Sequence, residues 1–373
     1  MFQPPYRAAV IGRTGRGDYG HGLDVAFRDH PKLKVVAVAD DDPKGLAAAA
    51  KRLGVDRAYP DYRTMLDREK PQFVAVAPRW LDGHREMIIA CAERGIHVFC
   101  EKPLAPALAD CDAIVEACER SHTKLAIAFQ TRYGPRYERV KELIASGAIG
   151  EVLELRGRGK EDRRGGGEDL MVLGSHLMDL FRGLLGEAAW CFARVTDRGR
   201  PVGRAEVRQG AEGIGPLAGD RIDAMYGFAG TPVVAHFATA RPKEPGRRFG
   251  LQILGSRGRI DLGTGWLPPA RLLADPTWSG ASDDAHWVEI TSAGLGKPEP
   301  LPPGGLGEAN QLIVTDLIHA VETDTQPRAS VYDGRASIEM ILACYASHFR
   351  SGLVTLPLAD RRRHPLEALG PGA

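Results

Sequence analysis

Short apolar segments alternate with helical stretches over the first third of this 373-residue chain. The apolar segments lack the polar alternation of half-exposed strands and cover residues 7–11, 33–39, 73–77, 97–100 and 125–129. Strands of this composition are typical of sheets that are buried on both faces. Helical patterns lie between them, at residues 22–29, 44–53, 63–68, 83–94 and 108–121. Because strands that alternate with helices make right-handed crossovers, the pattern predicts an α/β fold with a doubly wound parallel sheet.

The pattern changes after residue 130, where strand-like segments follow one another directly. They cover residues 152–156, 190–195, 222–228, 233–239, 248–254 and 259–262, with helical patterns before and among them at 136–146 and 170–185. This order predicts an α/β domain with a large, mainly antiparallel open sheet. The Pro- and Gly-rich residues 268–307 are expected to form a loop, and helices are expected at 308–323 and 333–351. We therefore expect two domains, 1–130 and 131–373.

Charge and cysteine content exclude several classes of protein. The chain has 49 Lys and Arg against 48 Asp and Glu, so no overall positive field favours a nucleic acid. The six cysteines show neither a CxxC pair nor zinc spacing, so we expect reduced thiols and no metal site. No apolar stretch is long enough to span a membrane, and the first residues lack a signal-peptide pattern. These features favour a cytoplasmic protein with neither a nucleic acid nor a membrane as partner.

A glycine-rich loop follows the first predicted strand. Glycines at this position let a pyrophosphate approach the backbone at a helix N-terminus. Two registers of the GxGxxG pattern compete: Gly12, Thr14 and Gly17, or Gly15, Gly17 and Gly20. We expect Gly12, Thr14, Gly15 and Gly17 to contact a dinucleotide; the alternative is a simple tight turn.

Asp40 ends the second predicted strand, where a Rossmann unit places the carboxylate that binds a ribose 2′-hydroxyl. A carboxylate there repels a 2′-phosphate. Asp41 and Asp42 follow it, and the next arginine after them is Arg52. We therefore expect NAD to be favoured over NADP as cofactor. The alternative is that these three residues form only a solvated turn and a helix cap.

The segment from Gly95 to Leu104 reads GIHVFCEKPL and resembles the GxHVxxEKPL signature of the Gfo/Idh/MocA oxidoreductases. The resemblance covers nearly the whole chain; other matching residues are Pro78, His84, Arg132, Tyr133, Gly147, Gly150, Gly174, His176 and Asp179. It implies a Rossmann domain followed by an α/β domain whose open sheet builds homodimers or homotetramers. It also implies an NAD-dependent dehydrogenase that acts on a secondary hydroxyl of a sugar, polyol or inositol-like substrate.

The resemblance also implies roles for individual residues. Glu101 would bind the nicotinamide ribose, and Lys102 would touch both this ribose and the reacting hydroxyl. Further cofactor contacts are expected from Pro78, His84 and Arg132, and a substrate contact is expected from Tyr133. Trp80 lies in a loop longer than is usual in the family, where it would either cover the cofactor or brace the loop.

Chemistry supports two of these residues independently. Removing hydride from a carbinol carbon needs a base for the hydroxyl proton and a cation near the developing alkoxide. Lys102 and His176 suit these tasks and are expected to be catalytic. Asp179 lies three positions after His176 on the same helical face, so it is expected to orient the imidazole or to bind substrate hydroxyls.

One departure from the family concerns the residue one helical turn before His176. Inositol dehydrogenase-like members carry an aspartate there, whereas this chain carries Val172. Glu168 or Asp169 would then turn inward instead, so Asp169 is included among the expected substrate residues, or His176 works without a partner. We hypothesise that Lys102 bears more of the proton transfer than usual. Two alternatives stay open: an NAD-assisted glycoside hydrolase or lyase with transient oxidation, and a non-catalytic NAD-binding protein.

Overall fold

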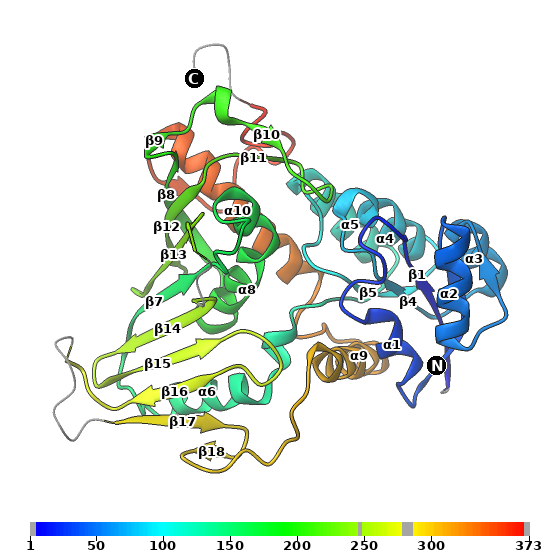
Figure 1. The fold of residues 1–373 in the computed structure, drawn as a ribbon, viewed down its shortest axis with the longest axis horizontal. Coiled ribbons are helices and arrows are strands. Elements are labelled where there is room, and N and C mark those ends of the chain that lie inside the picture. The colour runs from blue at the N-terminus through cyan, green and yellow to red at the C-terminus, as the bar shows by residue number, and fades with distance from the viewer. Residues whose placement is uncertain (1–4, 245–247, 278–285, 369–373) are drawn as a thin grey trace. The chain divides into compact units, whose positions relative to one another are not determined.

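The computed structural model describes residues 5–244, 248–277 and 286–368, which form two compact units. The first unit runs to Gln130 and also contains Ala211–Gly215 and Leu306–Ile338. The second contains Thr131–Gly210, Pro216–Gly305 and the chain from Glu339 onward. The first unit therefore takes in two segments that lie far beyond the expected division at residue 130. Figure 1 labels the elements of both units.

The first unit is built on a six-stranded sheet in the order β3-β2-β1-β4-β5-β6. All five strand pairs are parallel, which confirms the predicted doubly wound sheet. Strands β4 and β6 are buried along their whole length, as expected of a sheet that is covered on both faces. The strands are β1 Tyr6–Ile11, β2 Leu33–Ala39, β3 Ala58–Tyr59, β4 Phe73–Val76, β5 His97–Cys100 and β6 Leu125–Ile127.

Helix α2 (Pro43–Leu53) has capping residues at both ends. In α2 the Asp42 carboxylate accepts a hydrogen bond from Gly45 N at 2.6 Å, Pro43 takes the first helical position, and Gly54 ends the helix with φ 67°. The other helices are α1 Leu23–Arg28, α3 Tyr62–Glu69, η1 Leu81–Gly83, α4 His84–Ala92, α5 Leu108–Arg120 and η2 Gln130–Tyr133, the last of which crosses the unit boundary.

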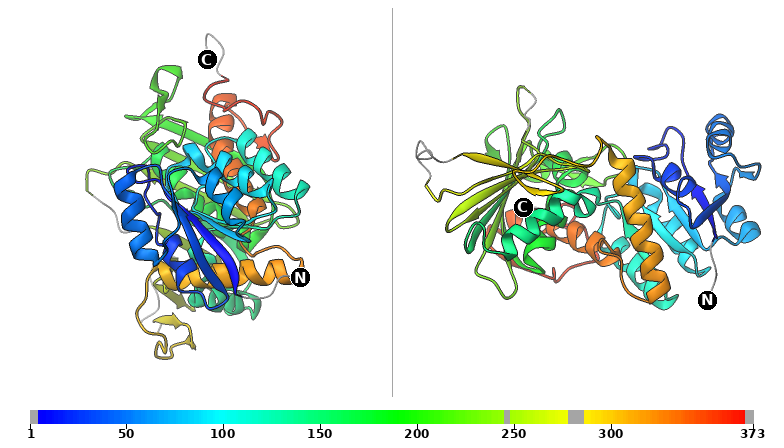
Figure 2. Two further views of the ribbon diagram at one scale, coloured as in Figure 1. Left: turned by 90° about the vertical axis from the view of Figure 1, so that its right-hand side faces the viewer. Right: turned by 90° about the horizontal axis from the view of Figure 1, so that it is seen from below.

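Helix α9 (Leu306–Thr323) joins the first unit from late in the sequence. It packs beside α1 and against β5 and β6, as Figure 2 shows. Glu322 near its end accepts hydrogen bonds from Tyr6 Oη at 2.9 Å and from Lys32 Nζ at 2.8 Å. These bonds and the apolar face of α9 complete the core of this unit.

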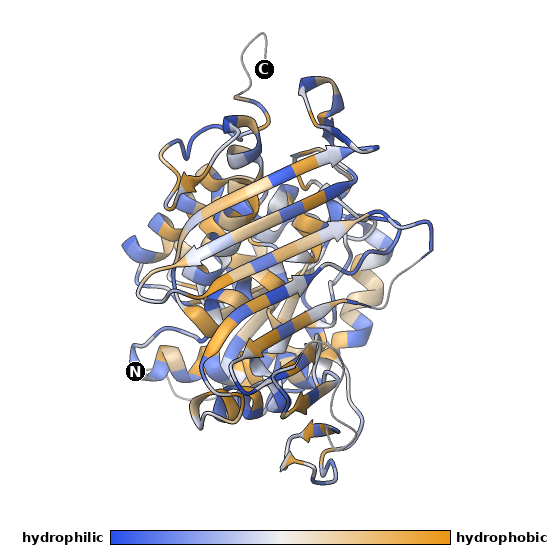
Figure 3. Cartoon of the chain, turned by 90° about the vertical axis from the view of Figure 1, so that its left-hand side faces the viewer, coloured by the Kyte–Doolittle hydropathy of each residue, from blue (hydrophilic) through white to orange (hydrophobic). Residues whose placement is uncertain are grey.

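The second unit contains a large sheet in the order β18-β17-β16-β15-β14-β7-β13-β12-β8-β19, with β9 paired to β8. Its strand pairs are antiparallel except for β7 with β13, which confirms the predicted mainly antiparallel sheet. Buried and exposed residues alternate along β12, β13 and β15, so one face is covered and the other open (Figure 3). The strands are β7 Val152–Arg158, β8 Ala188–Asp197, β9 Arg200–Pro201, β12 Arg221–Phe228, β13 Val234–Ala240, β14 Gly250–Gly255, β15 Gly258–Gly263, β16 Ala270–Leu273, β17 Trp287–Thr291, β18 Gly294–Leu295 and β19 Val354–Thr355.

The covered face packs on helices, as the buried Tyr226 of β12 illustrates. Its hydroxyl donates to the Met340 carbonyl oxygen of α10 (Val331–Arg350) at 3.0 Å, and its ring contacts Phe181 of α8 (Gly174–Leu185). A short pair of strands, β10 (Arg208–Gln209) and β11 (Pro216–Leu217), forms a separate two-stranded sheet after η3 (Arg204–Glu206). Helix α6 (Pro135–Ala145) packs against β17 of the main sheet. In the described part of the chain, no helix combines the length and apolar character needed to cross a membrane.

Two predicted elements were wrong. The expected helix 170–185 is two helices, α7 (Gly167–Val172) and α8, because Leu173 has φ −115° and interrupts the helical backbone. The expected loop 268–307 contains β16, β17 and β18. These strands are stabilised by their neighbours rather than by local sequence: Arg271 of β16 forms an ion pair with Asp261 of β15 at 2.8 Å and lies 4.0 Å above the Trp287 ring.

Candidate active site

The loop after β1 coils tightly. Arg13 and Asp18 exchange backbone hydrogen bonds of 3.1 and 3.0 Å across it. Gly17 has φ 88°, and a Cβ there would lie 2.3 Å from Arg79 N, so only glycine fits. A Cβ on Gly12 would lie 2.3 Å from the Tyr19 ring. The glycines thus allow the loop to fold onto the carboxyl ends of β1 and β4.

The Asp40 carboxylate is buried inside this loop, with 2% of the residue exposed. Its oxygens accept hydrogen bonds from Thr14 Oγ1 at 2.7 Å, Thr14 N at 3.1 Å, Tyr19 Oη at 2.8 Å and Asp42 N at 3.0 Å. Burial, followed by the bond to Asp40, raises the pKa of the Tyr19 phenol, so this phenol stays a donor. Asp40 therefore joins β2 to the glycine loop, a role that the sequence did not indicate.

A cavity of about 350 Å³ opens beside this loop at the carboxyl ends of β1 and β2. This is the edge of an open α/β sheet where ligands bind, and the volume lies in the range of roughly 300–1,000 Å³ of small-molecule pockets. Arg13, Asp41, Tyr62, Asp82 and Glu86 are among its lining residues. The side chain of Asp41 is 61% exposed, and its carboxylate lies 3.6 Å from Arg13 Nε.

Glu101 and Lys102 turn the chain at the carboxyl end of β5. Glu101 is fully buried, and its Oε1 accepts a bond from His21 N at 3.0 Å and pairs with His21 Nδ1. Its Oε2 accepts a bond from Lys102 N at 2.9 Å. Burial acts to raise the pKa of Glu101, but the hydrogen bonds and charge of His21, together with Lys102, hold this pKa at about 2. The Glu101 carboxylate is therefore ionised and fixed in orientation, and Lys102 itself is buried.

His84 holds the same turn from the other side. Its Nε2 lies 2.7 Å from the Pro78 carbonyl oxygen, and its Nδ1 lies 3.1 Å from the carbonyl oxygens of Pro103 and Leu104. The residue is fully buried. Pro78 and His84, expected to contact the cofactor, thus connect the loop after β4 to the Glu-Lys-Pro turn. Trp80, on the former loop, lies 5.9 Å below the guanidinium of Arg16.

The second unit holds the other group of expected residues. His176 and Asp179 stand on α8, and the His176 ring meets the Phe249 ring edge-on at 6.2 Å. Asp179 is 1% exposed, and its Oδ1 lies 3.3 Å from Arg132 Nη1, which also donates to the Asp179 carbonyl oxygen at 3.2 Å. Arg132 and Asp179, expected in separate roles, therefore pair with each other. Tyr133 is buried in the turn after β6.

Asp169 on α7 is buried between β13 and the preceding loop. Its Oδ2 accepts bonds from Thr239 Oγ1 at 2.5 Å and Glu161 N at 3.2 Å. Within the described residues its Oδ1 has no hydrogen-bond partner. Burial raises the pKa of this carboxyl, while the Thr239 bond opposes the rise. Because α7 ends at Val172, neither Asp169 nor Val172 lies on the helix that carries His176.

The expected residues therefore gather in two groups, one in each unit: the glycine loop with Asp40, Glu101 and Lys102, and α8 with Arg132 and Asp169. Sequence reasoning missed Tyr19 and His21. Both lie among the glycines of the first loop, where a bulky or ionisable side chain stands out in the sequence and could have indicated a specific contact. Across the described ranges, no group of three His, Cys, Asp or Glu side chains is placed to hold a metal ion.

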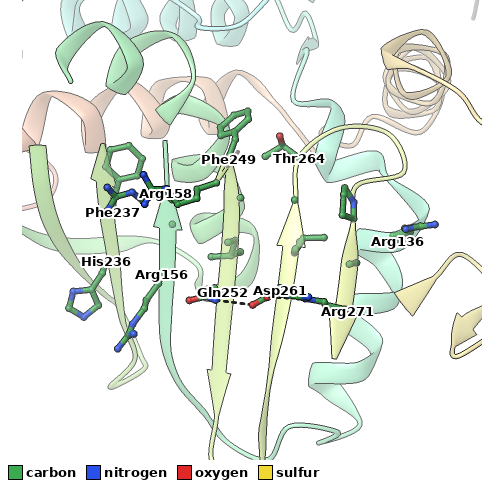
Figure 4. Close-up of a pocket in the computed structure, with 18 of the residues that line it drawn as sticks. Arg136, Arg156, Arg158, His236, Phe237, Phe249, Gln252, Asp261, Thr264 and Arg271 are labelled. Carbon is green, nitrogen blue, oxygen red and sulfur yellow. Dashed lines mark hydrogen bonds and ion pairs between the residues drawn. The ribbon is translucent and has the colours of Figure 1, made fainter. Parts of the chain in front are cut away.

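A second cavity, of about 1,100 Å³, lies on the open face of the sheet in the second unit (Figure 4). His236, Arg156, Gln252, Asp261 and Arg271 form a row of cross-strand neighbours from β13 to β16. None of the expected catalytic residues lines this cavity. It is a broad surface over the sheet, whose lining mixes apolar residues with the ionisable His236, Asp261 and Glu289.

Comparison with known proteins gives matches in both units. Residues 6–129 match the model of the oxidoreductase family with an NAD-binding Rossmann fold, GFO_IDH_MocA, and residues 137–261 match the GFO/IDH/MocA C-terminal domain. A D-apiose dehydrogenase of Paraburkholderia graminis is 33% identical over 192 residues, which cover 49% of this chain and half of that protein. A levoglucosan dehydrogenase of Pseudarthrobacter phenanthrenivorans is 29% identical over 283 residues, 67% of this chain and 72% of that protein. The solved structure of a levoglucosan dehydrogenase in complex with NADH shares the fold, with a TM-score of 0.75, 22% identity and coverage of 95% of this chain and 99% of that one.

Proposed function

Because the chain belongs to the Gfo/Idh/MocA family of oxidoreductases, we propose that it transfers hydride between NAD and a secondary alcohol of a sugar, polyol or inositol-like substrate. The observation that carries this proposal is the Glu-Lys-Pro turn at the carboxyl end of β5. There a buried, ionised Glu101 is held by His21, with Lys102 next in sequence. The names of the D-apiose and levoglucosan dehydrogenases support a carbohydrate substrate.

The residues of the first unit fit a dinucleotide. The cavity beside the glycine loop has a suitable volume and lies at the sheet edge where Rossmann folds bind nucleotides. Gly15 and Gly17 have positive φ, and a Cβ on Gly15 would meet open space, so the loop presents bare backbone on that side. We assign the glycine loop to the phosphates, the cavity to the adenosine half and Glu101 to the nicotinamide ribose.

When bound, NAD supplies a ring carbon that accepts or returns the hydride. The chain must then manage one proton and one developing negative charge on the substrate oxygen. We assign Lys102 the larger share of the proton transfer, because Val172, which precedes His176 by four positions, carries no side-chain group that could accept a proton or a hydrogen bond. His176 is assigned to the substrate hydroxyl, with Tyr133 and Asp179 as further substrate residues.

Arg132 is assigned a supporting role through Asp179. Its guanidinium holds this carboxylate from within the second unit. Asp169, fixed by Thr239 and Glu161 N, is assigned to the position of α7 and the loop before it. We therefore do not propose that Asp169 polarises the His176 imidazole.

The test is a screen of purified protein with NAD and a panel of aldoses, anhydrosugars and inositols. Reduced nicotinamide is followed by its absorbance, and products are identified by mass spectrometry. Stoichiometric reduced nicotinamide and a product two hydrogens lighter support the proposal. Cleavage or hydration of the sugar without net reduced nicotinamide would instead identify the NAD-assisted hydrolase or lyase. NAD binding with no change in any sugar would identify a non-catalytic protein.

We further propose that the open face of the second unit's sheet joins copies of the chain in a homodimer or homotetramer. Phe192 and Met225 are cross-strand neighbours on this face and are 45% and 36% exposed. They continue the row that includes His236, and exposed apolar side chains beside a polar row are typical of protein interfaces. Light scattering tests this: Phe192→Asp should reduce the mass to that of one chain, whereas Arg221→Ser on an outer part of β12 should not.

A further inference from the structure

Asp40 occupies the position at which a Rossmann fold reads the ribose, yet its carboxylate has no capacity left for a ligand. A carboxylate has about four lone-pair positions. Here they receive Thr14 N, Thr14 Oγ1, Tyr19 Oη and Asp42 N, all within this unit. A ribose hydroxyl would have to displace one of these donors and leave it without its partner in a buried or partly buried position, which is unfavourable.

The next residue, Asp41, lines the same cavity as Asp40 but is far more exposed. The bond from Asp42 N to Asp40 Oδ1 closes a tight turn after β2 and leaves the Asp41 side chain 61% exposed among the lining residues. Among the described residues its carboxylate has one ion-pair contact, Arg13 Nε at 3.6 Å, which is longer than a hydrogen bond. Asp41 therefore retains acceptor positions for a ligand.

The other acids around the cavity are engaged elsewhere. Asp61 caps α3 through Thr64 N at 2.7 Å, Asp82 pairs with Arg16 at 2.9 Å and Arg13 at 3.3 Å, and Glu86 pairs with Arg85 at 3.1 Å. Asp41 is thus the carboxylate of this cavity that is best placed to accept two hydroxyl groups of a ribose. A 2′-phosphate in the same position would meet its negative charge.

We infer that Asp41, rather than Asp40, binds the adenosine ribose of the dinucleotide and determines the preference for NAD over NADP. This inference rests on the proposed function. Asp40 is a positioning residue, which holds the glycine loop through Thr14 and Tyr19. The exposed Asp41 therefore determines which dinucleotide is preferred, and the buried Asp40 fixes the geometry of the glycine loop.

The test compares dissociation constants for NAD⁺ and NADP⁺ by isothermal titration calorimetry on the full chain. Loss of charge-assisted bonds to two hydroxyls is expected to weaken NAD⁺ binding by Asp41→Ser roughly 10- to 100-fold. NADP⁺ affinity should stay equal or rise, so the ratio of the two constants shifts at least about tenfold. The matched control is Glu86→Gln, which removes one negative charge from the same cavity and should change the ratio by less than about threefold.

A second pair of variants isolates the role of Asp40. Tyr19→Phe removes one donor from the Asp40 carboxylate without changing charge, and Asp40→Asn removes the charge. Both should weaken the two dinucleotides to the same extent and leave their ratio unchanged. An unchanged ratio in Asp41→Ser, or a ratio lost in Asp40→Asn, would overturn the inference, as would a wild-type chain that prefers NADP⁺. A wild-type chain that binds neither dinucleotide would instead refute the proposed function.

Discussion

Arg132 and Asp179 form a buried ion pair in the second unit, with Nη1 3.3 Å from Oδ1. Each residue comes from a separate motif, one after β6 and one on α8. Their pairing fixes the end of α8 that follows His176 against the turn that contains Tyr133. A change in either partner should therefore affect stability as well as activity.

Arg132→Met should lower the free energy of unfolding by about 3–5 kcal/mol, because it removes one side of a buried ion pair with Asp179. Urea denaturation at neutral pH measures the loss. The double variant Arg132→Met/Asp179→Leu should recover a large part of it. As a control, Arg221→Met breaks an exposed pair with Asp223 and should change stability by less than about 1 kcal/mol. Equal losses of stability in Arg132→Met and Arg221→Met would contradict the assignment of a buried pair.

Lys102→Met should reduce turnover with the natural substrate roughly 10²- to 10⁴-fold, the usual contribution of a positioned acid or base. NAD affinity should change only a few-fold, because the Lys102 main chain still bonds Glu101. Steady-state kinetics and calorimetry on one preparation separate the two effects. Near-normal turnover in this variant would show that another group moves the proton.

His21→Leu should make cofactor binding sensitive to acid. In the wild type the Glu101 pKa is about 2, below its ordinary value of 4.5. Its contribution to folding is therefore present above about pH 4.5 and is lost only as the pH falls toward 2. Without His21, burial acts unopposed by that partner and raises the pKa of Glu101.

The expected result is an NAD affinity that stays constant between pH 8 and about pH 5 in the wild type and falls with decreasing pH in His21→Leu. His21→Gln keeps a donor and should restore part of the wild-type profile. Parallel pH profiles in all three proteins would exclude a role for His21 in holding Glu101.

His364 should make the second unit sensitive to acid. Burial lowers the pKa of its imidazole to about 4, and Leu366 N donates to its Nδ1 at 3.2 Å. A folded-state pKa below the unfolded value of about 6.5 means that stability is complete above about pH 6.5 and is lost as the pH falls toward 4.

The expected loss from this residue is about 2–3 kcal/mol over that interval. His364→Leu should lack this part of the pH dependence, as measured by urea denaturation at a series of pH values. The same slope in wild type and variant would assign the acid sensitivity to other groups.

The strands of the first unit were predictable because burial on both faces requires an unbroken run of apolar residues, as in Phe73–Val76. The strands β16 to β18 were not, because their Pro- and Gly-rich surroundings favour loops. They are stabilised by pairing in series, β16 with β15, β17 with β16 and β18 with β17. The break between α7 and α8 at Leu173 could not be predicted, because the apolar periodicity of the sequence continues through this residue.

The candidate site divides in the same way. Glu101 and Lys102 lie where the motif predicted, because the end of a parallel strand fixes its position in the sheet. The contacts of Asp40 were not predictable, because they depend on how an eleven-residue loop from Gly12 to Gly22 coils back on itself. His21 reaches Glu101 by the same coiling, and no local pattern reports such a contact.

The late return of α9 has a consequence for synthesis on the ribosome. Asn310 on this helix donates to the His21 carbonyl oxygen at 2.9 Å and accepts from Gln130 Nε2 at 3.1 Å. Translation delivers Asn310 only after 179 intervening residues have emerged, from Thr131 to Ala309. The first unit therefore cannot complete its core until most of the second unit has been made, and an excised fragment ending at Gln130 would expose the apolar residues that α9 covers.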